Sequence, residues 1–276
     1  MKQTVKLILY YFIYQLGCSS VISFIAYAGY AMRRYSESGT FSLPEDGEAS
    51  LSVPAVILSL LLSNILMGIH LVWKRYVGRQ SWSKVSGRLM AAVLPLTLGM
   101  MLWMNYLTER FALPDFTAGM FVQMKDHILG VISIALVAPV FEEMLFRGAI
   151  EGHLLRIWKN PYAAILVSAL IFGVIHLNPA QIPYAFVLGL VLGWLYWRTS
   201  SLLPCILLHL VNNGLSVALM IAAPDSASSM DALFGGKTAL LLSIAGLLAT
   251  VITIRYITCQ TAGSTNAQAH KREPEV

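Results

Sequence analysis

The sequence predicts an all-α fold, a polytopic transmembrane helix bundle of about eight spans. Of the 276 residues, 57% are hydrophobic and only 12% are charged, and the mean hydropathy is +0.68. The apolar residues form runs of roughly 17 to 25, the length a helix needs to cross a hydrocarbon core of about 30 Å. A transmembrane β-barrel would instead need alternating segments of about 10 residues, and the sequence has no such period.

Eight apolar runs follow one another along the chain. They are residues 7–32, 51–73, 89–107, 127–147, 161–177, 182–197, 202–222 and 238–258. The first run is too long for a signal-peptide core, so we expect it to be retained as a span. The chain becomes polar and small after Cys259. We therefore expect one transmembrane domain at 1–259 and a disordered cytoplasmic tail at 260–276.

The distribution of charge predicts the orientation in the membrane. The connection between the second and third runs has five basic residues and no acidic one: Lys74, Arg75, Arg79, Lys84 and Arg88. The positive-inside rule places this loop in the cytoplasm. Counting spans from it puts both termini in the cytoplasm, and it puts outside the loops that carry Glu45, Asp46, Glu48, Asp115 and Asp225. The protein is thus expected to be a multi-pass protein of a cell membrane, in contact with membrane lipid.

Two other classes of function find no support in the sequence. The net charge of +5 is spread among loops, so no nucleic-acid partner is indicated. The three cysteines, Cys18, Cys205 and Cys259, occur singly, which indicates neither a disulfide framework nor a cysteine-based metal site.

Ionisable residues inside the spans are the candidates for function, because a charge at mid-bilayer costs several kcal/mol. They form three motifs on the fourth, fifth and seventh runs, within a candidate catalytic core at about 127–222: Glu142-Glu143-x-x-x-Arg147, Phe172-x-x-x-His176 and His209-x-x-x-Asn213. Residues four apart share one face of a helix. We therefore expect an ion pair within the first motif, an aromatic wall beside the imidazole in the second, and two hydrogen-bond donors on one stripe in the third.

The depths of the motifs agree. Glu142 lies 17 residues before Lys159, near the turn that joins the fourth and fifth runs, and His176 lies 17 residues after it. In an antiparallel helical hairpin the two side chains are level and can meet. His209 lies about eight residues, or roughly 12 Å, into the seventh run. The three motifs are therefore expected to converge.

Two chemistries fit such a site. Glu142 and His176 could activate a water molecule, while His209 and Asn213 stabilise the oxyanion formed at an amide carbonyl. The same set offers two histidines and one carboxylate, which resembles a catalytic zinc site. The motifs alone do not separate these alternatives, and no metal is assigned.

The three motifs, in this order and on separate helices, resemble the CPBP family of intramembrane proteases, also called the CAAX-protease and bacteriocin-processing or Abi family. The match covers about residues 127–222. Three short segments beside these motifs also resemble the family: Ala138-Pro139, Phe146-Arg147-Gly148 and His176-Leu177-Asn178.

The resemblance implies an intramembrane endopeptidase that hydrolyses a peptide bond in a membrane-associated or prenylated-type peptide or protein. In that assignment Glu142 and His176 activate water, His209 and Asn213 hold the oxyanion, and the supporting residues are Glu143, Arg147 and Phe172. The family has also been described as metal-dependent, which would make Glu142, His176 and His209 ligands of a divalent ion such as zinc. The compact chain with its short tail looks more like the bacterial than the eukaryotic members, so we expect a bacterial plasma membrane.

Two other functions are compatible with intramembrane Glu and His residues. A non-catalytic immunity or scaffold protein of the same fold would bind a partner, and Glu142 would then be dispensable. A secondary transporter could relay protons through intramembrane Glu and His. The sequence has no detectable internal repeat and no paired broken helices in two halves, which disfavours a transporter.

Overall fold

The computed structural model describes residues 2–40, 52–223 and 229–270. Within these ranges the chain is helical apart from turns, short connections and one isolated bridge between Trp82 and Ser201. The predicted all-α class is thus confirmed. Glu45, Asp46, Glu48 and Asp225, which we used to predict outside loops, lie beyond the described residues.

Fifteen helical segments make up this part of the chain. The longer ones are α1 (Lys2–Ser38), α2 (Val53–Trp73), α3 (Gly87–Glu109), α8 (Pro161–Val174), α9 (Ile182–Thr199), α10 (Leu202–Ala222) and α12 (Gly236–His270). Short segments are η1 (Arg79–Ser81), α4 (Ala118–Met124) and α11 (Met230–Phe234). One broken helix runs continuously through α5 (Ile128–Ile132), η2 (Ser133–Val137), α6 (Ala138–Glu143), η3 (Met144–Glu151) and α7 (Gly152–Ile157).

Six of these helices are long and apolar enough to cross a membrane: α1, α2, α3, the broken helix at 128–157, α10 and α12. The predicted spans at 161–177 and 182–197 correspond to α8 and α9, which are not among the six. The protein is therefore a multi-pass helical membrane protein, while the number of eight spans and the cytoplasmic termini stay predictions. Helix α12 continues to His270, so it extends into the segment predicted to be a disordered tail, and 271–276 lie outside the described residues.

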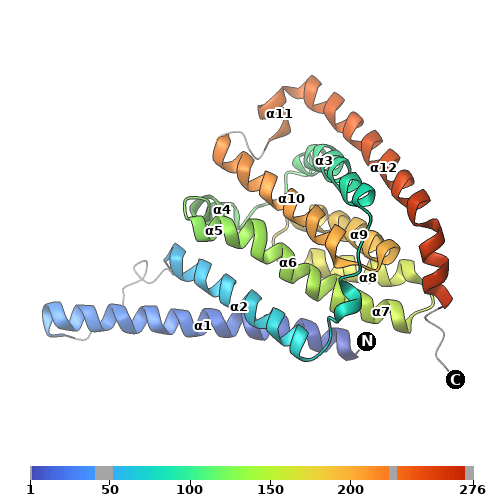
Figure 1. The fold of residues 1–276 in the computed structure, drawn as a ribbon. Helices are drawn as coiled ribbons and strands as arrows, with labels where there is room; N and C mark the ends of the chain where they lie inside the picture. The colour runs from blue at the N-terminus through green and yellow to red at the C-terminus, as the bar shows by residue number, and fades with distance from the viewer. Residues whose placement is uncertain (1, 41–51, 224–228, 271–276) are drawn as a thin grey trace.

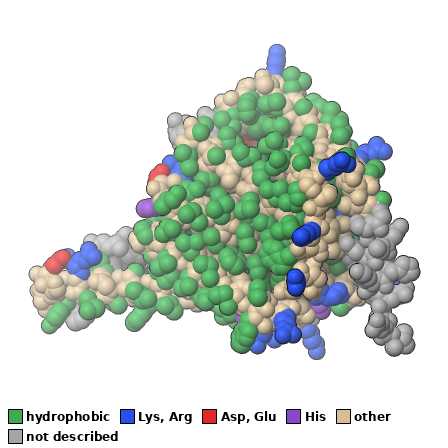
Figure 2. All heavy atoms as spheres, in the orientation of Figure 1, with side chains coloured by type: hydrophobic (Ala, Val, Ile, Leu, Met, Phe, Trp, Pro, Cys, Tyr) green, Lys and Arg blue, Asp and Glu red, His purple; other side chains and the backbone are tan. Residues whose placement is uncertain are grey.

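The helices pack as neighbouring pairs, and two of these pairs lie against the broken helix. Helix α1 packs along α2, α8 along α9, and α3 along α12. The broken helix lies between α2 and α10, so the segments that carry the first and third motifs are adjacent (Figure 1). The outer face is covered mostly by hydrophobic side chains, with Lys and Arg gathered toward its lower and right margins in Figure 2. The exposed hydrophobic residues include Phe24, Ile69 and Ile252, as expected for helices that face lipid.

Small residues permit two close helix contacts. A Cβ at Gly246 would lie 2.6 Å from the Gly99 carbonyl oxygen, where α12 crosses α3. A Cβ at Gly189 would lie 3.0 Å from the Cα of Ala169, where α9 crosses α8. Both contacts use the small residues that let transmembrane helices approach closely.

The broken helix departs from regular α-helical hydrogen bonding in two places. Segments η2 and η3 are π-helical, with bonds from residue i to i−5. At the end of η2 the N–H of Ala138 donates to the carbonyl of Ser133. The next residue, Pro139, has no N–H. The predicted fourth span is therefore one helix with altered backbone bonding just before its two carboxylates.

Candidate active site

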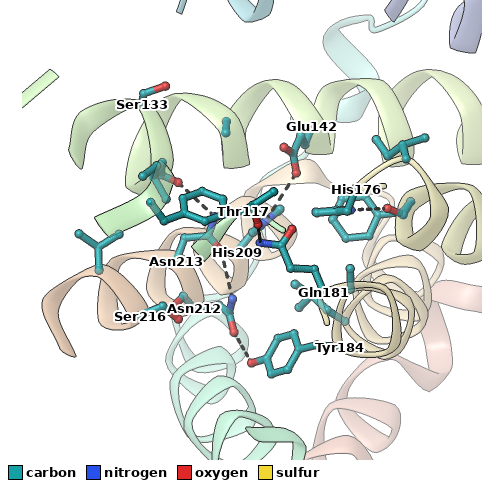
Figure 3. A pocket seen from close by; sticks show the side chains of 18 of the residues that line it. Thr117, Ser133, Glu142, His176, Gln181, Tyr184, His209, Asn212, Asn213 and Ser216 are labelled. Carbon is teal, nitrogen blue, oxygen red and sulfur yellow. Dashed lines mark hydrogen bonds and ion pairs between the residues drawn. The ribbon is translucent and has the colours of Figure 1, made fainter. Parts of the chain in front are cut away.

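One cavity of about 500 Å³ is lined by the four residues predicted to be catalytic: Glu142, His176, His209 and Asn213. Figure 3 shows Glu142 on α6 pointing toward His209, with His176 to one side and Asn213 one helical turn farther along α10. Phe172 lines the same cavity. The structure thus brings the three sequence motifs together, as their matched depths predicted.

Glu143 and Arg147 form the predicted ion pair, buried behind the cavity. Arg147 Nη1 lies 3.3 Å from Glu143 Oε1, and both side chains are fully buried. Arg147 Nη2 also donates to the backbone carbonyl of Gly189 at 3.3 Å. The pair therefore ties the broken helix to α9, and it leaves Glu142 facing a different direction.

His209 contacts both carboxylates of the first motif. Its Nδ1 donates to Glu143 Oε1 at 2.8 Å, because an ionised carboxylate can only accept. Its Nε2 lies 3.8 Å from Glu142 Oε2, on the side of the cavity. The sequence predicted that these three residues would be near one another, but not that Glu143 would bind His209.

His176 lies just after the end of α8, whereas its motif was expected to lie within a helix. Helix α8 ends at Val174, so the predicted helix 161–177 is too long at this end, and His176 occupies the turn that follows. Leu177 has φ of +52°, a left-handed conformation that cannot continue the helix. The His176 Nδ1 donates to the carbonyl of Phe172 at 2.7 Å, which satisfies a carbonyl of the last helical turn.

The Phe172 ring packs beside the imidazole as predicted. The two ring centroids are 5.1 Å apart and the planes are nearly perpendicular. Since the carbonyl of Phe172 takes the Nδ1–H, the other ring nitrogen of His176 is the one free to act on a ligand in the cavity.

A cluster of hydrogen bonds holds the turn after His176 against the α3–α4 loop. Asn178 is fully buried, and its Nδ2 donates to Asp115 Oδ1 at 2.9 Å. Its Oδ1 accepts from the Phe116 N–H at 3.1 Å. Asp115 also accepts from the backbone N–H groups of Thr117 and Ala118. Burial raises the pKa of Asp115, but these hydrogen bonds outweigh it and hold that pKa below its ordinary value of 3.8.

Two residues that sequence reasoning did not select join the site. Tyr184 on α9 donates its hydroxyl to Asn212 Oδ1 at 2.6 Å, and Asn212 Nδ2 donates to Asn213 Oδ1 at 3.0 Å. Asn213 Nδ2 in turn donates to the carbonyl of Ile134 at 3.1 Å. The adjacent amides of Asn212 and Asn213 within an apolar run were a usable signal, whereas nothing in the sequence marked Tyr184.

Glu151 is a further buried carboxyl group that sequence reasoning did not select. Its side chain is fully buried, and a Cβ at Gly193 would lie 2.6 Å from its Oε2. Gly193 therefore provides the space that this carboxyl group occupies, behind the cavity.

The possible metal ligands Glu142, His176 and His209 line the same cavity, but their side chains are not arranged as a metal site. Within the described ranges, no group of three or more His, Cys, Asp or Glu side chains is placed to hold a metal ion. One nitrogen of each histidine is already used, His176 Nδ1 by a carbonyl and His209 Nδ1 by Glu143. A zinc-dependent reaction therefore stays a prediction for experiment.

The central part of the chain is similar to known membrane peptidases. Residues 125–215 match the family model described as type II CAAX prenyl endopeptidase Rce1-like. The membrane-embedded CAAX protease MroQ of Staphylococcus aureus is 30% identical over 101 residues, which are 35% of this chain and 41% of the relative. The putative membrane peptidase YdiL of Bacillus subtilis is 31% identical over 93 residues, 34% of this chain and 38% of the relative.

A third relative extends the match. The UPF0177 protein in the abiGi 5' region of Lactococcus lactis is 27% identical over 168 residues, 58% of this chain and 71% of the relative. The chain spans about two fifths of the length of the first two relatives. No solved structure matches the chain. The matched segment contains all three motifs, so residues 125–215 are similar to the Rce1-like domain of CAAX-type membrane peptidases.

Proposed function

We propose that the protein is an intramembrane endopeptidase of a bacterial plasma membrane that hydrolyses a peptide bond by activated water. The observation that supports this most is the convergence of Glu142, His176, His209 and Asn213 on one cavity of about 500 Å³. The cavity combines an apolar lining with a few polar groups, as binding sites for small molecules and peptide segments commonly do.

Glu142 and His176 are the proposed pair that activates water. The Glu142 carboxyl group is partly accessible, with 18% of its side chain exposed, so water can reach it. The Nδ1 of His176 is held by the Phe172 carbonyl, which presents Nε2 as the proton acceptor or donor. Water attack on an amide carbon requires a base to take the proton and an acid to give one to the leaving amine. These two groups provide both functions.

His209 and Asn213 are the proposed donors to the oxyanion. Donation from His209 Nε2 requires the imidazolium form, because Nδ1–H is already given to Glu143. The Asn213 amide nitrogen has one hydrogen on Ile134 and a second one for a ligand. Donors fixed before the reaction stabilise developing charge effectively in a site shielded from water.

The charge of the cavity favours cleavage within a chain over removal of a terminal residue. Glu142 is an acid, and among the described residues that line the cavity none is Lys or Arg. A free terminal carboxylate would therefore lie near Glu142 without a Lys or Arg to bind it. An internal, uncharged peptide segment fits better, and the name of the family model suggests a prenylated peptide as the first probe.

The test is cleavage of a farnesylated fluorogenic peptide, and of its unlipidated counterpart, by protein purified in detergent. Glu142→Gln and His176→Ala should each lose activity by about 10²-fold or more, since general acid–base groups contribute about 10²–10⁴-fold. Two exposed residues give matched controls, Glu37→Gln and His127→Ala, which should cleave at the wild-type rate. Wild-type activity in Glu142→Gln would contradict the proposal and favour the immunity or scaffold protein.

A chelator such as 1,10-phenanthroline, added to the same assay, separates the two chemistries. Unchanged activity supports activation of water by Glu142 and His176 alone. Loss of activity that zinc restores would show a metal-dependent reaction, with Glu142, His176 and His209 as the candidate ligands.

A further inference from the structure

The orientation of one amide determines whether Asn213 can act as a donor. The side chain of Asn carries an NH₂ group, which donates, and an oxygen, which accepts, at positions of nearly equal size. If the amide of Asn213 were rotated by 180°, its oxygen would face a developing oxyanion and repel it. The proposed role of Asn213 therefore needs surroundings that select one orientation.

The backbone carbonyl of Ile134 selects the orientation of the Asn213 amide. A backbone carbonyl can only accept a hydrogen bond, so the Asn213 group that faces Ile134 at 3.1 Å is the NH₂. The Asn213 oxygen must then face Asn212, whose NH₂ lies 3.0 Å away. The Asn212 oxygen in turn faces Tyr184, whose hydroxyl donates at 2.6 Å. One carbonyl thus determines the direction of every hydrogen bond in the series that runs from Ile134 through Asn213 and Asn212 to Tyr184, which we call the relay (Figure 3).

Pro139 explains why this carbonyl is available inside a helix. In the π-helical register of η2, Ala138 N–H donates to Ser133, five residues earlier. The next bond in that register would run from residue 139 to Ile134. Proline has no N–H and cannot form it. The Ile134 carbonyl accepts from Asn213 instead, across the contact between η2 and α10.

We propose that Pro139, Tyr184 and Asn212 are positioning residues that fix the amide of Asn213 as a donor toward the substrate. The proposal rests on the proposed peptidase function and deepens it. Pro139 frees the carbonyl at one end of the chain, and Tyr184 holds Asn212 at the other. None of the three needs to touch the reacting atoms.

Kinetics of single variants test the proposal on the farnesylated fluorogenic peptide. Removal of an oxyanion donor costs about 10²–10³ in kcat, so Asn213→Ala should fall in this range. Tyr184→Phe removes only the hydroxyl, and kcat should fall by about tenfold with KM unchanged. Tyr14→Phe is the matched control, since it removes a hydroxyl that pairs with His70 outside the cavity lining. An unchanged kcat in Tyr184→Phe would overturn the relay.

A double variant distinguishes positioning from general destabilisation. If Tyr184 acts through Asn213, then Tyr184→Phe in the Asn213→Ala background should cause no further loss of kcat. A further tenfold loss there would overturn the proposal. Pro139→Ala provides an opposite test, because it restores an N–H that competes for Ile134 and removes a helix-breaking residue. We expect kcat to fall while the unfolding midpoint stays equal or rises, and an unchanged kcat would count against the relay.

The same variants separate failure of the relay from failure of the proposed function. If Glu142→Gln abolishes cleavage while Tyr184→Phe and Pro139→Ala keep the wild-type kcat, only the relay is wrong. If the wild type cleaves no probe, the proposed activity on prenylated peptides is wrong. The hydrogen bond between Tyr184 and Asn212 can then still be tested by measuring stability. Tyr184→Phe and Asn212→Ala should then lower the unfolding midpoint in SDS less than additively when combined, and additive losses would overturn the relay.

Discussion

Glu143 accepts the Nδ1–H of His209 at 2.8 Å, so the first and third sequence motifs are joined directly behind the cavity. The same carboxylate oxygen lies 3.3 Å from Arg147. Glu143 therefore has two functions at once: it neutralises a buried guanidinium, and it determines that His209 presents Nε2 to Glu142 and the cavity. Two neighbouring glutamates thus differ in role because a helix turns them by about 100°.

Glu143→Gln should destabilise the protein. The amide cannot neutralise Arg147, which is fully buried, and removal of one partner of a buried ion pair costs about 3–5 kcal/mol. The unfolding midpoint in an SDS titration measures the loss, with Glu37→Gln as the exposed control. Equal midpoints for Glu143→Gln and wild type would mean that the pair contributes little to stability.

Asn178→Ala should weaken the turn that follows His176. The substitution leaves the Phe116 N–H and the Asp115 carboxylate each without one partner, and a buried group left unsatisfied costs about 1–3 kcal/mol. We expect a lower unfolding midpoint and a lower kcat, because His176 lies two residues away. The exposed Gln123→Ala is the control. A lower midpoint with unchanged kcat would show that the turn stabilises the fold without positioning His176.

Asp115 should make stability depend on pH at the acidic end. Its pKa is lower in the folded protein than its ordinary value of 3.8, so the folded state favours the ionised carboxylate. This contribution to stability is fully present above pH 3.8 and is lost as the pH falls through the lower folded value. Unfolding midpoints between pH 2.5 and 5 should therefore fall more steeply for wild type than for Asp115→Asn. Parallel curves would contradict the assignment.

Gly246→Ala should separate α12 from α3. The added Cβ would lie 2.6 Å from the Gly99 carbonyl oxygen, a backbone atom that cannot rotate away, and overpacking of this kind costs about 1–3 kcal/mol. Gly17→Ala is the matched control, because a Cβ there meets nothing within 4 Å. It should be neutral or slightly stabilising, since Ala has the higher helix propensity by up to about 1 kcal/mol. Equal midpoints in the two variants would contradict the close contact.

The sequence was sufficient to predict the class of fold and the meeting of the three motifs. Apolar run length determines helices in lipid, and an i, i+4 spacing determines which side chains share a face, so the Glu143–Arg147 pair followed directly. The end of α8 could not be predicted in this way, because it depends on the left-handed Leu177 and on the bonds of Asn178 to a loop some 60 residues earlier. Long-range contacts of this kind leave no local period in a sequence.

The same reason explains the residues that were missed. Tyr184 belongs to the site only because α9 packs against α10, and tyrosines are ordinary in an apolar run that forms a span. Pro139 belongs to a sequence segment that resembles the family. Its effect on the Ile134 carbonyl, however, depends on the hydrogen-bond register of the backbone, which the sequence does not show. Burial of Glu151 depended on Gly193 of another helix.

The π-turn at Ser133–Val137 has a consequence for how this helix can vary in length. A π-turn holds one residue more than an α-turn, so it is equivalent to a single inserted residue that rotates the preceding segment by about 100° about the axis. Glu143 is anchored to Arg147 and His209 on the far side of the turn. Deletion of one residue within the turn should therefore keep the carboxylates in place and rotate α5, whose Gly130 faces the Met124 carbonyl at the end of α4. Changes of length in this stretch thus move α5 and the Ile134 carbonyl that Asn213 binds, while the two carboxylates stay in place.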